Sequence, residues 1–158
     1  MDKREYKELS ELAANGGTKA FARLYETVYR EMYYTAFYSL CDDADAVELV
    51  TASARDGISA INKLRSEEAF RAFMLRNLCA RIRTRLKESP VRPAAKNDGS
   101  DGFDIRAEFA KLGDTERLVA SMYIGARLQP DEISLYTGIG STAVNKTLEK
   151  VLTAFELD

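Results

Sequence analysis

A glycine-centred turn near the C-terminal end constrains the fold more than any other feature of this sequence. The tetrapeptide Thr137-Gly138-Ile139-Gly140 separates two helical patterns, and Gly138 can adopt the left-handed conformation that ends a helix. Pro130 suits the first turn of the preceding helix, where its missing amide proton is not needed. After the turn, apolar residues recur at steps of four, three and four, which places them on one helix face: Val144, Leu148, Val151 and Phe155.

The second helix also has a polar side, which carries Thr142, Lys146, Glu149 and Lys150. Two helices joined in this way are typical of a helix-turn-helix, whose second helix can enter the major groove of DNA. A three-helix packing unit with a solvated polar face would give the same pattern. Charge does not decide between the two, because residues 104–158 hold six Lys/Arg against nine Asp/Glu. Such a segment gains little from counterion release, so we expect weak DNA binding alone and infer a partner.

Composition narrows the class of protein. The chain is 46% apolar and 30% charged, and it has neither an apolar run that could span a bilayer nor a signal-peptide core. We therefore expect a globular cytoplasmic protein without membrane insertion. Histidine is absent and no glycine-rich phosphate loop occurs, so we expect no enzyme, no cofactor and no metal site. Cys41 and Cys79 lack metal or redox spacing, which favours buried, reduced thiols.

Helical periodicity extends through the rest of the chain and predicts an all-α fold. The segment Ser89–Phe103 contains two prolines and two glycines and has no period, which is typical of a flexible linker. We therefore predict two small helical domains joined by that linker. The expected ranges are an N-terminal helix at 1–16, a helical domain at 17–89, the linker at 90–103 and the helix-turn-helix domain at 104–158.

Positive charge is concentrated on the predicted helix 66–88. From Lys63 to Lys87 the chain holds eight Lys/Arg and only two acidic residues. Aromatic residues beside such a track suit single-stranded nucleic acid, because bases stack while phosphates meet cations. A solvated basic helix face is the alternative interpretation. The candidate residues for nucleic-acid binding are Phe70, Phe73, Arg76, Arg81, Arg83, Arg85 and Lys87.

Five tyrosines interleave along the predicted helix that starts near Thr18. Their rings could stack on bases, but helical spacing on a long central helix favours core or interface packing. They are Tyr25, Tyr29, Tyr33, Tyr34 and Tyr38.

Three stretches resemble the extracytoplasmic-function group of bacterial RNA polymerase sigma factors. FARLYETVYREMYYTAFYSLCDDADAVELV (21–50) is similar to the opening helices of the family's region two, with an acidic and apolar signature at its end. SEEAFRAFMLRNL (66–78) is similar to a later segment of region two, and LGDTERLVASMYIGARLQPDEISLYTGIGSTAVNKTL (112–148) to region four. The resemblance covers roughly Gly17 to Phe155.

The resemblance implies a non-enzymatic factor that binds core RNA polymerase and directs promoter recognition and transcription initiation. Its partners would be core polymerase, promoter DNA and, in some family members, an anti-sigma factor. The basic helix would contact the melted promoter element, and polymerase would contact Asp45, Glu48 and Leu49. The upstream promoter element would be read by Ser141, Thr142, Asn145, Lys146 and Lys150.

The chain also departs from the family pattern in region two. Phe73 stands at the usual tryptophan, while Ala80 and Thr84 stand at an asparagine and an aspartate. Thr51 and Ala52 replace the Gln-Glu that follows the acidic signature. A sigma-like regulator is therefore the alternative prediction: it would keep the scaffold for protein contacts and would not open promoters.

Overall fold

The computed structural model describes residues 1–92 and 104–155, and within these ranges the chain is helical without a β-strand. The predicted all-α class is confirmed. The main helices are α1 (Lys3–Ala14), α2 (Thr18–Leu40), α3 (Asp43–Ala60), α4 (Glu67–Glu88), α5 (Ile105–Ala110), α6 (Asp114–Ala120), α7 (Pro130–Thr137) and α8 (Ser141–Ala154). A 3-10 turn, η1 (Ile61–Lys63), and a π-helical turn, η2 (Ser121–Gly125), complete them.

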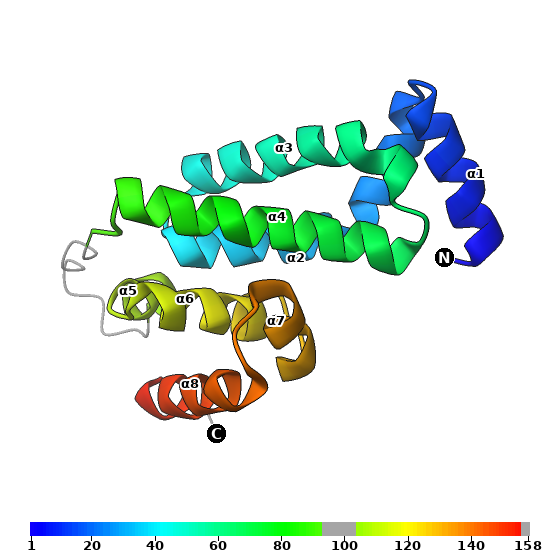
Figure 1. The fold of residues 1–158 in the computed structure, drawn as a ribbon. Coiled ribbons are helices and arrows are strands. Elements are labelled where there is room, and N and C mark those ends of the chain that lie inside the picture. Colours follow the sequence, from blue (N-terminus) through cyan, green and yellow to red (C-terminus); the bar gives the residue numbers. More distant parts are fainter. Residues whose placement is uncertain (93–103, 156–158) are drawn as a thin grey trace.

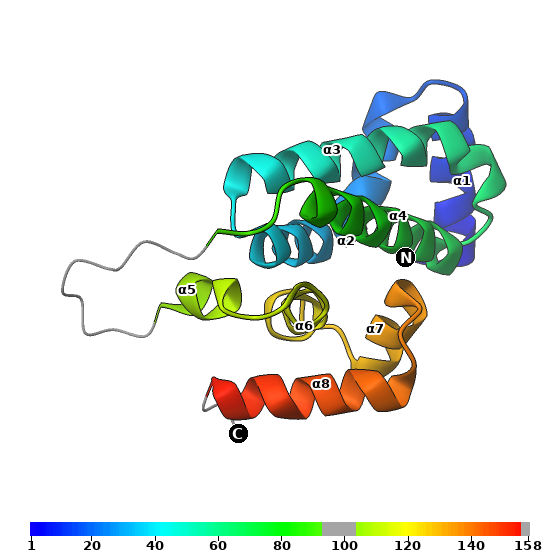
Figure 2. The ribbon, with the colours of Figure 1, turned by 60° about the vertical axis from the view of Figure 1, so that its left-hand side comes forward.

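The helices stack in layers. Helices α2, α3 and α4 run side by side, and α1 crosses one end of them (Figure 1). The C-terminal half lies against this bundle, with α6 and α7 next to it and α8 outermost (Figure 2). One long face of α8 is therefore turned away from the rest of the molecule.

Local sequence sets the helix starts. The carboxylate of Asp2 accepts a hydrogen bond from the Glu5 amide at 2.7 Å, and Asp42 and Ser66 cap α3 and α4 in the same way. Such side chains satisfy amides that have no partner inside the helix, which contributes about 1 kcal/mol each.

Helix α2 forms the centre of one continuous hydrophobic core. It packs against α1, α3 and α4 and also against α6 and η2 of the C-terminal half. Val28 and Met32 of α2 are fully buried in the same cluster as Leu118 and Met122. Burying each such side chain contributes about 1.5–3 kcal/mol. The two halves thus share a core, and the predicted layout of two separate domains is not confirmed.

A second, smaller cluster of aromatic residues also joins the two halves. The ring of Tyr38 stacks on Phe109 at 4.8 Å between centroids, and Phe109 meets Phe155 edge to face at 5.3 Å. This cluster joins α2, α5 and the end of α8. The predicted linker at 90–103 lies outside the described residues except for its first three positions.

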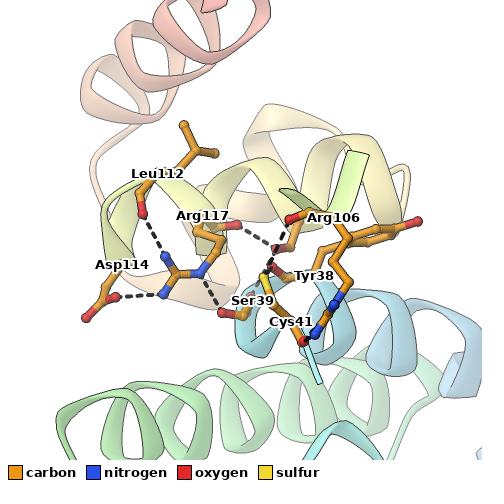
Figure 3. Close-up of polar contacts among 8 residues, drawn as sticks. Tyr38, Ser39, Cys41, Arg106, Leu112, Asp114 and Arg117 are labelled. Atoms are coloured by element: carbon orange, nitrogen blue, oxygen red, sulfur yellow. Dashed lines mark hydrogen bonds and ion pairs between the residues drawn. The ribbon is translucent and has the colours of Figure 1, made fainter. Parts of the chain in front are cut away.

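Arg117 makes a buried polar link between the halves. Its side chain is 2% exposed, and its guanidinium donates to the carbonyl of Ser39 at 2.6 Å and to the carbonyl of Leu112 at 2.7 Å (Figure 3). It also forms an ion pair with Asp114 at 2.7 Å. Because Ser39 lies in the last turn of α2, the cation meets the negative end of that helix dipole.

We expect Arg117→Met to destabilise the fold by roughly 2–4 kcal/mol, because the two carbonyls would lose charged donors in a buried place. Urea denaturation followed by far-UV circular dichroism measures the change. Arg55→Met is the control, since Arg55 is exposed on α3 and makes no side-chain hydrogen bond or ion pair within the described chain. If Arg117→Met lowered the free energy of unfolding by no more than the roughly 0.5 kcal/mol expected of surface changes, Arg117 would not stabilise the contact between the halves.

The shared core also predicts how a cut chain behaves. A protease site engineered between residues 93 and 103 should yield two fragments that stay together, because buried side chains of both halves contact each other. Size-exclusion chromatography of the cut protein should give one peak with the mass of both fragments. Two separate peaks at micromolar concentration would show that the halves are independent.

Candidate nucleic-acid interface

Side-chain hydrogen bonds hold the turn between α7 and α8. The hydroxyl of Thr137 donates to the Ile133 carbonyl at 2.6 Å and accepts from the Ile139 amide at 3.1 Å. Ser134 donates to the Ile139 carbonyl at 2.6 Å. Gly138 has φ +77°, the left-handed conformation that the sequence predicted for it. The turn therefore holds α8 in one direction relative to α7.

The two faces of α8 match their predicted burial. Val144 is fully buried, Leu148 and Val151 are also buried, and the helix packs against α6 and α7. The predicted DNA-contact residues are all exposed on this helix: Ser141, Thr142, Asn145, Lys146 and Lys150. Lys150 also pairs with Glu116 of α6 at 2.9 Å. Two helices joined by a short turn are thus present, and DNA binding by them remains a prediction.

The basic helix α4 exposes part of its predicted row. Arg76, Arg83 and Lys87 are exposed, and Phe73 is half-buried against the core. Arg76 donates through Nε to the carbonyl of Leu135 in α7 at 3.4 Å. The C-terminal half thus borders the row at Arg76. Further along α4, Arg83 and Lys87 line a hollow together with Asp114 and Thr115 of α6.

Two predicted contact residues belong to the core instead. Phe70 has no exposed surface and meets Phe21 of α2 edge to face at 6.1 Å. It lies four residues before Met74, which is also fully buried, so both occupy the inner face of α4. Leu49 is buried on α3 as well. In this arrangement the ring of Phe70 is not accessible to a base, and Leu49 offers little surface to a polymerase. Their predicted contacts remain predictions.

Residues predicted for two different partners pair with each other. Arg85, a predicted DNA contact, bonds Asp45 at 2.8 Å and Glu48 at 3.0 Å, both predicted polymerase contacts. The hydrogen bond to Glu48, together with the nearby carboxylates, raises the pKa of Arg85 above its usual value. The acids at the start of α3 and the cation near the end of α4 therefore form one charge cluster.

A second cluster neutralises another predicted DNA contact. Arg81 forms an ion pair with Asp56 of α3 at 2.5 Å, and Asn77 donates to the same carboxylate at 3.0 Å. The hydrogen bonds from Arg81 and Asn77 lower the pKa of Asp56. Fewer cations of α4 are consequently available to nucleic acid than the sequence alone implied.

Comparison with known proteins leaves the family open. No protein-family model matches the chain, and no curated protein or solved structure matched it either. The resemblance to sigma factors thus remains a prediction. In the described ranges, no helix is long and apolar enough to cross a membrane, and no group of three or more His, Cys, Asp or Glu could hold a metal ion.

The thiols behave as predicted. Cys41 and Cys79 are both buried and unpaired. Burial raises the pKa of Cys79 to about 12 and also raises that of Cys41, so both stay protonated at neutral pH.

Sequence reasoning missed the cations that connect distant helices. Arg71 of α4 bonds Glu31 of α2 at 3.2 Å and Glu132 of α7 at 3.3 Å. No local pattern predicts it, because its partners lie far away in the chain. Arg117 left a weak signal, since it stands four residues before the buried Ser121 and so on the inner face of its helix.

Substitutions on the two faces of α8 should have different effects. Leu148→Ala should destabilise the fold by roughly 2–4 kcal/mol, because it leaves a cavity in the core. Lys146→Ala should leave the melting temperature within about 2 °C of the wild type, because the side chain is exposed and unpaired in the described chain. Thermal unfolding followed by circular dichroism tests both. A Lys146→Ala chain that melts like Leu148→Ala would mean that the helix is rotated.

Proposed function

We propose that this chain is a sigma-like transcription initiation factor that binds core RNA polymerase and promoter DNA. The observation that carries the proposal is the free outer face of α8, presented by a helix-turn-helix whose turn is held by its own side chains. A helix presented in this way can enter a major groove. The five polar side chains on that face supply donors for phosphates and base edges.

Partner binding supplies the affinity that the helix-turn-helix lacks. Asp45 and Glu48 open α3 and keep part of their carboxylates exposed, which suits a basic surface of polymerase. A cation of polymerase would compete with Arg85 for these acids. Arg85 would then be released toward DNA, so that polymerase binding and DNA binding support each other.

Initiation requires the two halves to separate. The resemblance implies two separate promoter elements, one read by α8 and one contacted by the basic helix α4, and a single factor must reach both. A compact chain of this size has a radius of gyration of only about 15 Å. The contacts of α7 with α4, through Arg71 and Arg76, would have to break when the factor binds polymerase.

The shared core favours a second candidate function. A chain that stays closed could still bind polymerase or another protein through α3 and act as a sigma-like regulator without opening promoters. Phe70, Arg81 and Arg85 are already engaged inside the molecule, which reduces the set of residues available for melted DNA. The two candidates differ in whether the halves must separate.

A reversible lock across α4 and α7 tests this difference. Arg71→Cys with Glu132→Cys places two thiols where an ion pair joins the helices, and a short disulfide-forming cross-linker can connect them. The native thiols are buried and should react slowly. With core polymerase and a library of genomic fragments, we expect transcription from the unlocked chain, its loss on locking and its recovery with reductant.

Three controls define the outcome. Each single cysteine variant treated with the cross-linker should keep its activity. A pull-down with core polymerase reports binding independently of transcription. If the locked chain initiates as well as the unlocked chain, the halves need not separate for initiation. If the unlocked chain binds polymerase but never initiates, the chain is the sigma-like regulator.

A further inference from the structure

A small hollow lies where the two halves of the chain meet. Its volume is about 210 Å³, which leaves room for a phosphate group and a few waters. Side chains of α2 form one wall, and residues at and just after η2 form the other. The residues used below are Arg30, Tyr34, Tyr38, Ile105, Gly125 and Arg127.

Two arginines without counter-ions line this hollow. The guanidinium of Arg30 lies over the ring of Tyr34 at 5.0 Å from the centroid, which orients it without neutralising its charge. Within the described ranges, neither Arg30 nor Arg127 makes a side-chain hydrogen bond or ion pair, and no acid lines the hollow. Asp104 precedes the lining residue Ile105, but its carboxylate accepts from the amide of Ala107 at 3.3 Å.

Arg127 occupies a strained backbone position. Its φ is +61°, in the left-handed region that favours glycine. Hydrogen bonds on both sides hold the position: the amide of Ala126 donates to Ser121 and that of Leu128 to Met122, both at 2.9 Å. A glycine would fit this backbone without strain. An arginine there points to a use for its side chain.

The wall of the hollow is tightly packed. A Cβ placed on Gly125 would lie 2.7 Å from Cδ2 of Tyr38, so the backbone two residues before Arg127 is pressed against α2. The ring of Tyr38 stacks on that of Tyr34 at 6.1 Å. The turn after η2 and the aromatic side chains of α2 are therefore packed tightly against each other. Each of these two walls contributes one arginine to the hollow.

We propose that this hollow binds a phosphate group, with Arg30 and Arg127 as its ligands. Guanidinium groups bind phosphate oxygens through paired, charged hydrogen bonds, and two unpaired arginines at one hollow suit the negative charge of a phosphate group. Arg30 comes from the N-terminal half of the chain and Arg127 from the C-terminal half. A bound phosphate group therefore joins the halves and favours the closed arrangement. The site does not require that the chain bind polymerase.

Binding to the full-length chain tests the site directly. Pyrophosphate, a nucleoside triphosphate and a ten-nucleotide single-stranded DNA are titrated by isothermal calorimetry at constant ionic strength. We expect saturable binding and a rise in melting temperature that grows with ligand concentration, because a ligand of the folded state stabilises it. Tighter binding of the DNA would identify nucleic acid as the source of the phosphate, and tighter binding of the triphosphate a free nucleotide.

Variants separate the site from general charge effects. Arg30→Ala and Arg127→Gly should each weaken pyrophosphate binding at least tenfold, while the exposed control Arg55→Ala should bind like the wild type. Arg127→Gly removes the cation and suits the left-handed backbone, so the free variant should melt no lower than the wild type. Wild-type chain that binds none of the three probes, or variants that bind as well as wild type, would overturn the proposal.

Discussion

The buried guanidinium of Arg117 is the interaction on which the arrangement of the two halves depends. A charge out of water is costly unless its donors are satisfied, and here the acceptors come from two separate parts of the chain. Ser39, at the end of α2, and Leu112, just before α6, both offer carbonyls. Helix α6 can satisfy Arg117 only when it lies against the end of α2. Since α6 also packs on α8, this contact also fixes where α8 lies.

Several charged side chains near this contact form ion pairs within the molecule. The basic segment of α4 divides into cations that tie helices together, such as Arg71 and Arg85, and cations that stay exposed, such as Arg83 and Lys87. The first group holds α2, α3 and α7 in place and is available to a partner only when that partner displaces an acid. The same residues therefore hold the chain closed and are candidates for partner contacts. A partner that binds the acids of α3 also frees a cation of α4.

The periodicity of the sequence was enough to predict the helices and the two faces of α8. Val144 and Lys146 lie on the sides that their spacing indicated, because burial within a single helix follows its 3.6-residue repeat. The same reasoning did not indicate that Phe70 is buried. It lies within an apolar pattern and beside a basic one, and only the packing of Phe21 against it shows which surface it belongs to.

The sequence by itself determined what is local: the helix starts and the left-handed turn at Gly138. These depend on backbone preferences and on residues within about one helical turn of each other. Only the tertiary structure decided that the halves share a core, that Arg85 pairs with Glu48, and that Arg30 and Arg127 line one hollow. Those contacts join residues far apart in the chain, so they depend on how whole helices pack. The periodicity of a sequence does not indicate which helices pack together.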